Sequence, residues 1–149
     1  VVRPLLQAGA RSLVIANRTE PRARALAEAV RDDLPHGDVR GVALSAVRPE
    51  FDLIVNATSA GLGSEGRSPD IDPATVAGAV CYDMIYTTGP IESAAPTTVF
   101  CRWAHRHGAG RVLDGLGMLV EQAALAFELW RGVTPATAPV LELLRGPGV

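Results

Sequence analysis

The polar side chains best suited to binding chemistry follow a short apolar run at Ser12–Ala16. Asn17, Arg18, Thr19 and Arg22 stand there, at the start of a helical pattern. Arg18 and Arg22 are four residues apart, so both guanidinium groups can close on one phosphate beside a helix N-terminus. In a dinucleotide-binding fold, an arginine at this place accommodates the 2′-phosphate of NADP, whereas an acidic residue selects NAD. Solvated arginines at a helix start explain the same pattern.

A second polar turn, residues 56–62, follows the apolar run FDLIV. Its small side chains, Thr58 and Ser59 among them, allow a ligand to approach the backbone closely. A polar turn that only caps a strand fits the same residues. Adenine-type methyltransferases also start a catalytic loop with Asn after a strand, but Asn56 is not followed by the prolines and aromatic ring of that loop.

Two more turns carry candidate ligand-binding residues. Met84 and Tyr86 lie on the same side of an extended chain, where Tyr86 could present its hydroxyl to a substrate. Farther along, Gly115 precedes a helical pattern in which Met118 and Gln122, four residues apart, share a face. A packed tyrosine at a strand end and a surface glutamine are the alternative interpretations.

The histidine and cysteine pattern predicts no metal site. His36, His105 and His107 do not converge on a ligand spacing, and we expect them on the surface. Cys81 and Cys101 also lack metal-type spacing, and Cys81 lies in an apolar run that predicts a buried thiol.

An alternation of strands and helices has to position these turns. We expect strands at residues 12–16, 39–44, 51–57, 79–84 and 111–113, and helices at 20–34, 99–107 and 117–130, with short helices ending near residues 9 and 144. This order predicts an α/β fold with a doubly wound parallel sheet, in which ligands bind beyond the carboxyl ends of the strands. Residues 61–73 and 89–98 read as exposed loops.

Composition sets the limits of this interpretation. The 149 residues suit a single domain with a net charge of -2, which provides no basic stripe for nucleic acid or an anionic membrane. No apolar run reaches the length of a membrane span, and we expect a cytoplasmic protein. All 14 basic residues are arginines, so this chain by itself offers no lysine amine for chemistry.

Taken together in their order, four motifs resemble the C-terminal half of shikimate dehydrogenase. They are NRTxxR from Asn17, FDLIVNATSAG from Phe51, YDMIY from Tyr82, and DGLGMLVxQA from Asp114. The resemblance implies a Rossmann-like NADP-binding domain over residues 1–149. It also implies a reversible, NADPH-dependent reduction of 3-dehydroshikimate to shikimate, a step toward chorismate and the aromatic amino acids.

The resemblance assigns roles residue by residue. The residues that it places on the NADP cofactor are Asn17, Arg18, Thr19, Arg22, Thr58, Ser59, Met84, Gly115 and Met118. Of these, Met84 and Gly115 match positions near the nicotinamide, and Met118 matches a position at the same end of the cofactor site. Tyr86 and Gln122 match residues that touch the substrate. A small-molecule substrate is therefore the expected partner, and a homodimer is compatible with the family although no pattern in the chain specifies it.

The chain also departs from the family pattern. The N-terminal substrate domain with its catalytic Lys–Asp pair is absent from these residues, as are the first strand and the glycine-rich phosphate loop that would precede Val1. We therefore expect little or no dehydrogenase activity from this polypeptide alone. The segment 87–98 is longer than usual, and Val99 stands where proline is common. A non-catalytic nucleotide-binding or regulatory module and a quinate/shikimate dehydrogenase are the alternatives.

Overall fold

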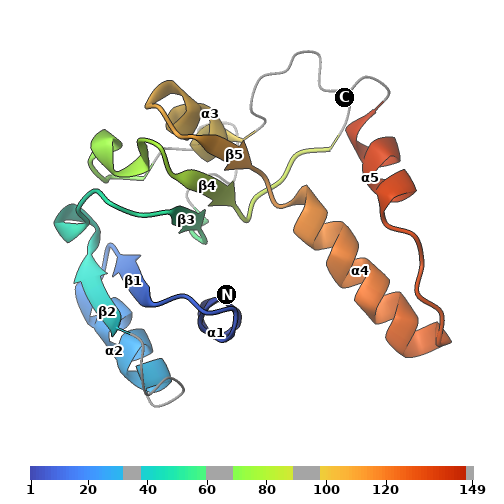
Figure 1. Cartoon of the computed structure of the whole chain (residues 1–149), viewed down its shortest axis with the longest axis horizontal. Helices are drawn as coiled ribbons and strands as arrows, with labels where there is room; N and C mark the ends of the chain where they lie inside the picture. The colour runs from blue at the N-terminus through green and yellow to red at the C-terminus, as the bar shows by residue number, and fades with distance from the viewer. Residues whose placement is uncertain (32–37, 60–68, 89–97, 147–149) are drawn as a thin grey trace. The chain divides into compact units, whose positions relative to one another are not determined.

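The computed structural model describes residues 1–31, 38–59, 69–88 and 98–146. The chain divides into two compact units, residues 1–48 with 70–72 and residues 49–69 with 73–149. Both contain parallel strands and helices, which confirms the expected α/β class (Figure 1). The strands form two sheets, of two and three strands, where the sequence predicted one. In a complete doubly wound sheet, the first strand of the fold lies between the second and the fourth and pairs with both. Among the described strands, none pairs with strands of both sheets, so no strand takes that joining position.

The first unit is built on two parallel strands. Its elements are α1 (Val2–Gln7), β1 (Ser12–Asn17), α2 (Glu20–Arg31), β2 (Asp38–Ala43) and a 3-10 turn at Leu44–Ala46. The register runs from Ser12 opposite Asp38 to Asn17 opposite Ala43. The helix expected near residue 9 is therefore confirmed as α1, and Gly9 follows it with a φ of 95° that favours glycine.

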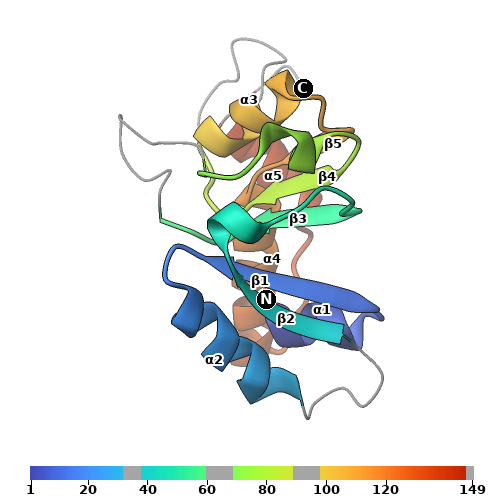
Figure 2. The ribbon, with the colours of Figure 1, turned by 90° about the vertical axis from the view of Figure 1, so that its left-hand side faces the viewer.

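Helix α2 covers this sheet through a stripe of small and branched residues. Ala23, Ala27 and Val30 recur at helical spacing and are all buried. Under them, a Cβ atom on Gly41 would lie 2.4 Å from the carbonyl carbon of Ala23, so this close approach of helix to strand requires glycine. Figure 2 shows α2 lying along the β1–β2 pair.

The second unit holds three parallel strands in the order β3-β4-β5. Its elements are β3 (Leu53–Asn56), a 3-10 turn at Pro73–Val76, β4 (Val80–Asp83), α3 (Val99–Arg106), β5 (Arg111–Leu113), α4 (Leu116–Arg131) and α5 (Ala138–Arg145). Its buried core lies where α3 packs against β4 and β5, and consists of Val76, Ala79, Cys81, Phe100 and Ala104.

Helix α3 begins and ends at residues that cap it, and the first of them differs from our expectation. The Thr98 side chain accepts a hydrogen bond from the Cys101 N–H and caps the helix, while Gly108 follows its end with a φ of 84°. We expected Thr98 to belong to an exposed loop, but it is buried because its hydroxyl also bonds within the sheet. The other residues of that loop, 89–97, lie outside the described part.

Most predicted elements are confirmed, with shifted ends. β5 coincides with the prediction, and β3 and β4 are one or two residues shorter at each end. At their carboxyl ends the Asn56 and Asp83 side chains accept the N–H groups of Thr58 and Ile85, which turns the chain. The helix predicted over 20–34 is confirmed as far as Arg31, and residues 32–34 lie outside the described part. Of the loop predicted at 61–73, residues 61–68 are likewise outside it, and Pro73 begins a 3-10 turn.

Helix α4 is buried only near its start. Leu116 and Val120 are its buried residues. Its later turns expose large apolar side chains, namely Leu125, Phe127, Leu129 and Trp130. The helix predicted over 117–130 is thus confirmed, although its second half contributes nothing to the core of the second unit.

Candidate functional site

The turn after β1 presents two cations in the first unit. The Asn17 side-chain oxygen accepts the Thr19 N–H at 2.8 Å, and the Thr19 carbonyl accepts the Arg22 N–H at 3.0 Å. These bonds turn the chain from β1 into α2. We call residues 17–22 the arginine turn.

Both cations of the arginine turn are open to solvent. Arg18 and Arg22 are exposed, and neither forms an ion pair with any residue in the described ranges. The nearby Glu20 instead pairs with Arg24, one turn along α2. Two such guanidinium groups beside the N-terminus of a 12-residue helix favour an anion there, because the free N–H groups and the helix dipole act in the same direction.

In the second unit, the ends of β3 and β4 are joined by buried polar side chains. Asn56 donates its side-chain N–H to the Asp83 carboxylate at 3.0 Å. Its side-chain oxygen accepts both the N–H and the hydroxyl of Thr58, at 3.2 and 2.8 Å. Asn56 is therefore occupied inside the protein, whereas Thr58 and Ser59 are exposed at the strand end, as a ligand-binding turn requires.

Asp83 is the centre of this arrangement and is completely buried. Besides Asn56, it accepts the Thr98 hydroxyl at 2.6 Å and the Ile85 N–H at 3.2 Å. A buried carboxylate is tolerated when several donors satisfy it, and here the donors come from β3, from the turn after β4 and from the start of α3. We call Asn56, Thr58, Asp83 and Thr98 the strand-end network.

Sequence reasoning did not find the network, although one signal was available. An acidic residue inside the apolar run AVCYDM demands partners, because an unpaired buried charge is costly. Within β4, buried Cys81 and Asp83 alternate with half-buried Val80 and Tyr82, so Asp83 belongs to the buried side of the strand. Thr98 gave no comparable signal, because its partner is 15 residues away.

The residues predicted near the nicotinamide end lie close together around the turn after β5. A Cβ atom on Gly115 would lie 2.3 Å from the Met84 carbonyl oxygen, so this approach requires glycine. The Gly115 N–H also donates to the Ile85 carbonyl at 3.0 Å. Met118 is half-buried in the first turns of α4. The structure thus brings together Met84 and Gly115, which are far apart in the chain.

The two residues predicted for the substrate are both accessible. Tyr86 is 41% exposed beyond the end of β4, and Gln122 is exposed on α4. Tyr82, which is not among the predicted site residues, is half-buried in β4. The pKa of Tyr82 is raised, because burial and the charge of Asp114 outweigh the opposite effect of a hydrogen bond with the Met118 backbone.

Thiol and metal chemistry have no support in the described residues. Burial raises the pKa of Cys81 to about 11 and also raises that of Cys101, so both thiols stay protonated at neutral pH. His105 and His107 are exposed, as predicted, and His36 lies outside the described part. No cluster of three metal-ligating side chains occurs among the residues that the structure describes. None of the described helices has the length and apolarity needed to cross a bilayer.

Residues 115–145 match the family model described as the shikimate 5′-dehydrogenase C-terminal domain. Over 145 residues, the chain is 46% identical to a shikimate dehydrogenase (NADP(+)) of Alkalilimnicola ehrlichii, covering 97% of the chain and 50% of that relative. The chain thus spans about half the length of the curated relatives it matches.

Solved structures give the same result. An Ael1 enzyme from Pseudomonas putida is 40% identical with a TM-score of 0.76, over 98% of this chain and 50% of that one. A shikimate 5-dehydrogenase from Thermus thermophilus, in complex with NADP(H) and shikimate, is 33% identical with a TM-score of 0.67, over 92% and 46%. The matching half of the curated relatives is the C-terminal one. This chain therefore belongs to the shikimate dehydrogenase family and corresponds to its C-terminal domain.

Proposed function

We propose that this chain is the NADP-binding half of a shikimate dehydrogenase, which interconverts 3-dehydroshikimate and shikimate. The observation that carries the cofactor assignment is the pair of exposed arginines in the arginine turn, which have no ion-pair partner among the described residues. Arg18 and Arg22 supply charge for a 2′-phosphate. No acidic residue of the turn is placed to select a 2′-hydroxyl, because Glu20 is paired with Arg24.

The remaining cofactor residues divide between the units. Asn17 and Thr19 belong with the arginines at the adenosine end, all in the first unit. The residues assigned to the rest of the cofactor lie in the second unit and are Thr58, Ser59, Met84, Gly115 and Met118. The close approach of the Gly115 and Met84 backbones puts these two assigned residues at one place in the second unit. Bound NADPH supplies the hydride for reduction of the 3-keto group.

Tyr86 and Gln122 are assigned to the substrate. Their exposed hydroxyl and carboxamide can donate to and accept from the hydroxyl and carboxylate groups of a cyclohexene acid. The chain has no lysine, so the lysine of the family's Lys–Asp pair is not among these residues. We therefore assign proton transfer to the family's Lys–Asp pair outside these residues, so that the 149 residues alone give little or no turnover.

Nucleotide titration tests the cofactor assignment. By calorimetry, the chain is expected to bind NADP more tightly than NAD, and Arg18→Ala is expected to weaken NADP binding by roughly tenfold or more, since a charge-assisted contact to phosphate is lost. Arg31→Ala is the matched control, because it removes the same charge from the other end of α2. Equal affinity for NADP and NAD would contradict the assignment.

The proposal also covers the activity of the 149 residues alone, the compartment in which the protein works and its oligomeric state. An NADPH-dependent assay with 3-dehydroshikimate is expected to show no significant rate for the 149 residues alone, and clear turnover would contradict this point. A reducing cytoplasm suits a protein whose two cysteines are both free and buried. A homodimer is compatible with the resemblance, and light scattering can measure the oligomeric state.

A further inference from the structure

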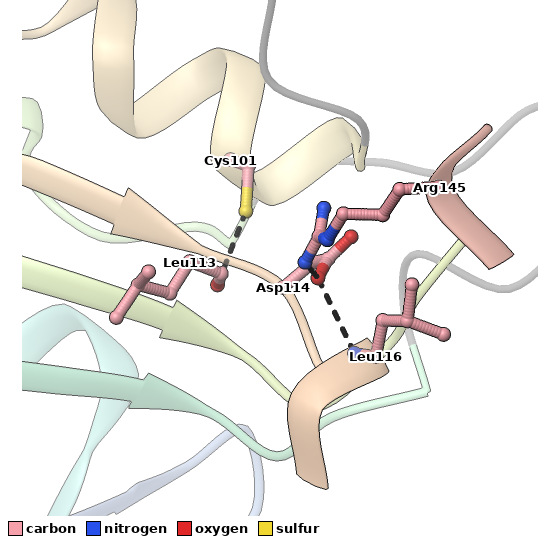
Figure 3. Close-up of polar contacts among 5 residues, drawn as sticks. All are labelled: Cys101, Leu113, Asp114, Leu116 and Arg145. Atoms are coloured by element: carbon pink, nitrogen blue, oxygen red, sulfur yellow. Dashed lines mark hydrogen bonds and ion pairs between the residues drawn. The ribbon is translucent and has the colours of Figure 1, made fainter. Parts of the chain in front are cut away.

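The turn between β5 and α4, residues 113–116, is held by three other elements. The Cys101 thiol of α3 donates to the Leu113 carbonyl at 3.4 Å (Figure 3). The Gly115 N–H donates to the Ile85 carbonyl beyond β4. The third contact comes from α5, where an Arg145 nitrogen lies 2.9 Å from Asp114 Oδ1.

The Asp114 carboxylate does two things at once. The same Oδ1 atom accepts the Leu116 N–H at 3.2 Å, one of the otherwise unpaired N–H groups that open α4. The side chain is only 2% exposed, so its negative charge has little access to water. A buried carboxylate is favoured by a partner cation, and Arg145, which is 31% exposed, supplies one.

Helix α5 is otherwise weakly attached. None of its residues is buried, and its packing is against α4. Arg145 lies in its last turn, where a cation also favours the helix dipole. The ion pair therefore fastens the C-terminal helix to a turn 31 residues earlier in the chain, as Figure 3 shows.

We propose that Arg145 is a positioning residue for the nicotinamide end of the cofactor site, acting through Asp114. This rests on the proposed function, in which Gly115 and Met118 contact the cofactor. When the guanidinium is lost, the Asp114 carboxylate turns toward water, the Leu116 N–H loses its acceptor, and the backbone at Gly115 and Met118 becomes mobile. The arginine turn is in the other unit and has no residue in this arrangement.

The test compares two ligands on the 149-residue chain by calorimetry. NADPH contains the nicotinamide, whereas 2′,5′-ADP carries only the adenosine end. Arg145→Ala is expected to weaken NADPH binding by about tenfold, within the range of couplings carried by such contacts, and to leave 2′,5′-ADP binding unchanged. Arg145→Lys is expected to recover most of the loss. Arg131→Ala, which removes an exposed arginine from the last turn of α4, is the matched control.

Three other results of this titration would contradict the role proposed for Arg145. Equal weakening of both ligands, or an unchanged NADPH affinity, would overturn it while leaving the proposed function intact. Failure of the unaltered chain to bind 2′,5′-ADP would overturn the proposed function and this inference with it. If Arg145→Ala does not fold, Arg145→Gln carries the same comparison. Hydrogen exchange at the Leu116 and Met118 amides must also accelerate in the folded variant, since a purely distant effect would leave these amides protected.

Discussion

The arginine turn after β1 and the strand-end network after β3 and β4 use polar side chains in opposite ways. In the first, Arg18 and Arg22 are open to solvent without ion-pair partners among the described residues. In the second, Asp83 is completely buried and accepts three hydrogen bonds. Polar groups left open are available to a ligand, whereas satisfied and buried groups shape the backbone that the ligand meets.

This difference separates binding from stability. An exposed guanidinium contributes little to folding, because water already solvates it well. A buried carboxylate with its donors contributes much more, since removing it leaves those donors unsatisfied. Substitutions in the arginine turn should therefore change ligand affinity with little effect on stability, whereas substitutions in the strand-end network should mainly change stability.

The largest effect is expected at the centre of the strand-end network. Asp83→Ala leaves the Asn56 amide and the Thr98 hydroxyl buried without their acceptor. We expect a loss of about 3–5 kcal/mol in the free energy of unfolding, measured by urea denaturation with circular dichroism. Asp83→Asn keeps one acceptor oxygen and should lose less. Equal losses for the two variants would contradict the role given to the carboxylate.

Alkaline pH should destabilise the second unit through its thiols. The pKa of Cys81 is raised from 9.0 to about 11, so the unfolded chain releases this proton first as the pH rises. The contribution of the protonated Cys81 thiol to the free energy of unfolding is fully present below pH 9 and is lost progressively toward pH 11. The loss amounts to roughly 2–3 kcal/mol for such a shift. Urea midpoints measured across this range should fall, and Cys81→Ala should flatten the decline. A decline of the same slope in that variant would refute this origin.

Two glycines, one before α4 and one inside its first turn, provide a matched test of the close approach at Gly115. Gly115→Ala places a Cβ atom 2.3 Å from the Met84 carbonyl oxygen and should cost about 1–3 kcal/mol. Gly117→Ala meets no atom within 4 Å and should leave stability unchanged or raise it by up to about 1 kcal/mol. Thermal unfolding of both variants measures this difference, and similar melting temperatures would show that the close approach is unimportant.

The smallest effect on stability is expected in the arginine turn. Arg18→Ala and Arg22→Ala remove exposed side chains and should change the free energy of unfolding by no more than about 0.5 kcal/mol. Both should nevertheless weaken binding of 2′,5′-ADP, measured by calorimetry under the same conditions. A variant that unfolds more easily, with unchanged nucleotide affinity, would reverse the contrast between the two regions.

The sequence allowed the strands and most helices to be predicted, because local periodicity specifies them. It also placed Met84 and Gly115 in turns that follow strands, and the parallel pairing of β4 with β5 explains why these two turns meet. It did not predict that Thr98 bonds to Asp83 or that Arg145 reaches Asp114. Those contacts join residues 15 and 31 positions apart, and their pairing depends on tertiary packing that no local pattern encodes.

The positions of the two tryptophans give the second unit an optical signature of its own. Trp103 is half-buried, with its ring centroid 5.9 Å from that of Phe100, whereas Trp130 is 77% exposed. Both belong to the second unit, and the first unit contains neither tryptophan nor tyrosine. Trp130→Phe would leave one emitter, Trp103, which packs against the core and is less accessible to iodide than Trp130. Fluorescence would then follow the unfolding of the three-stranded sheet alone, while the two-stranded sheet melts unseen.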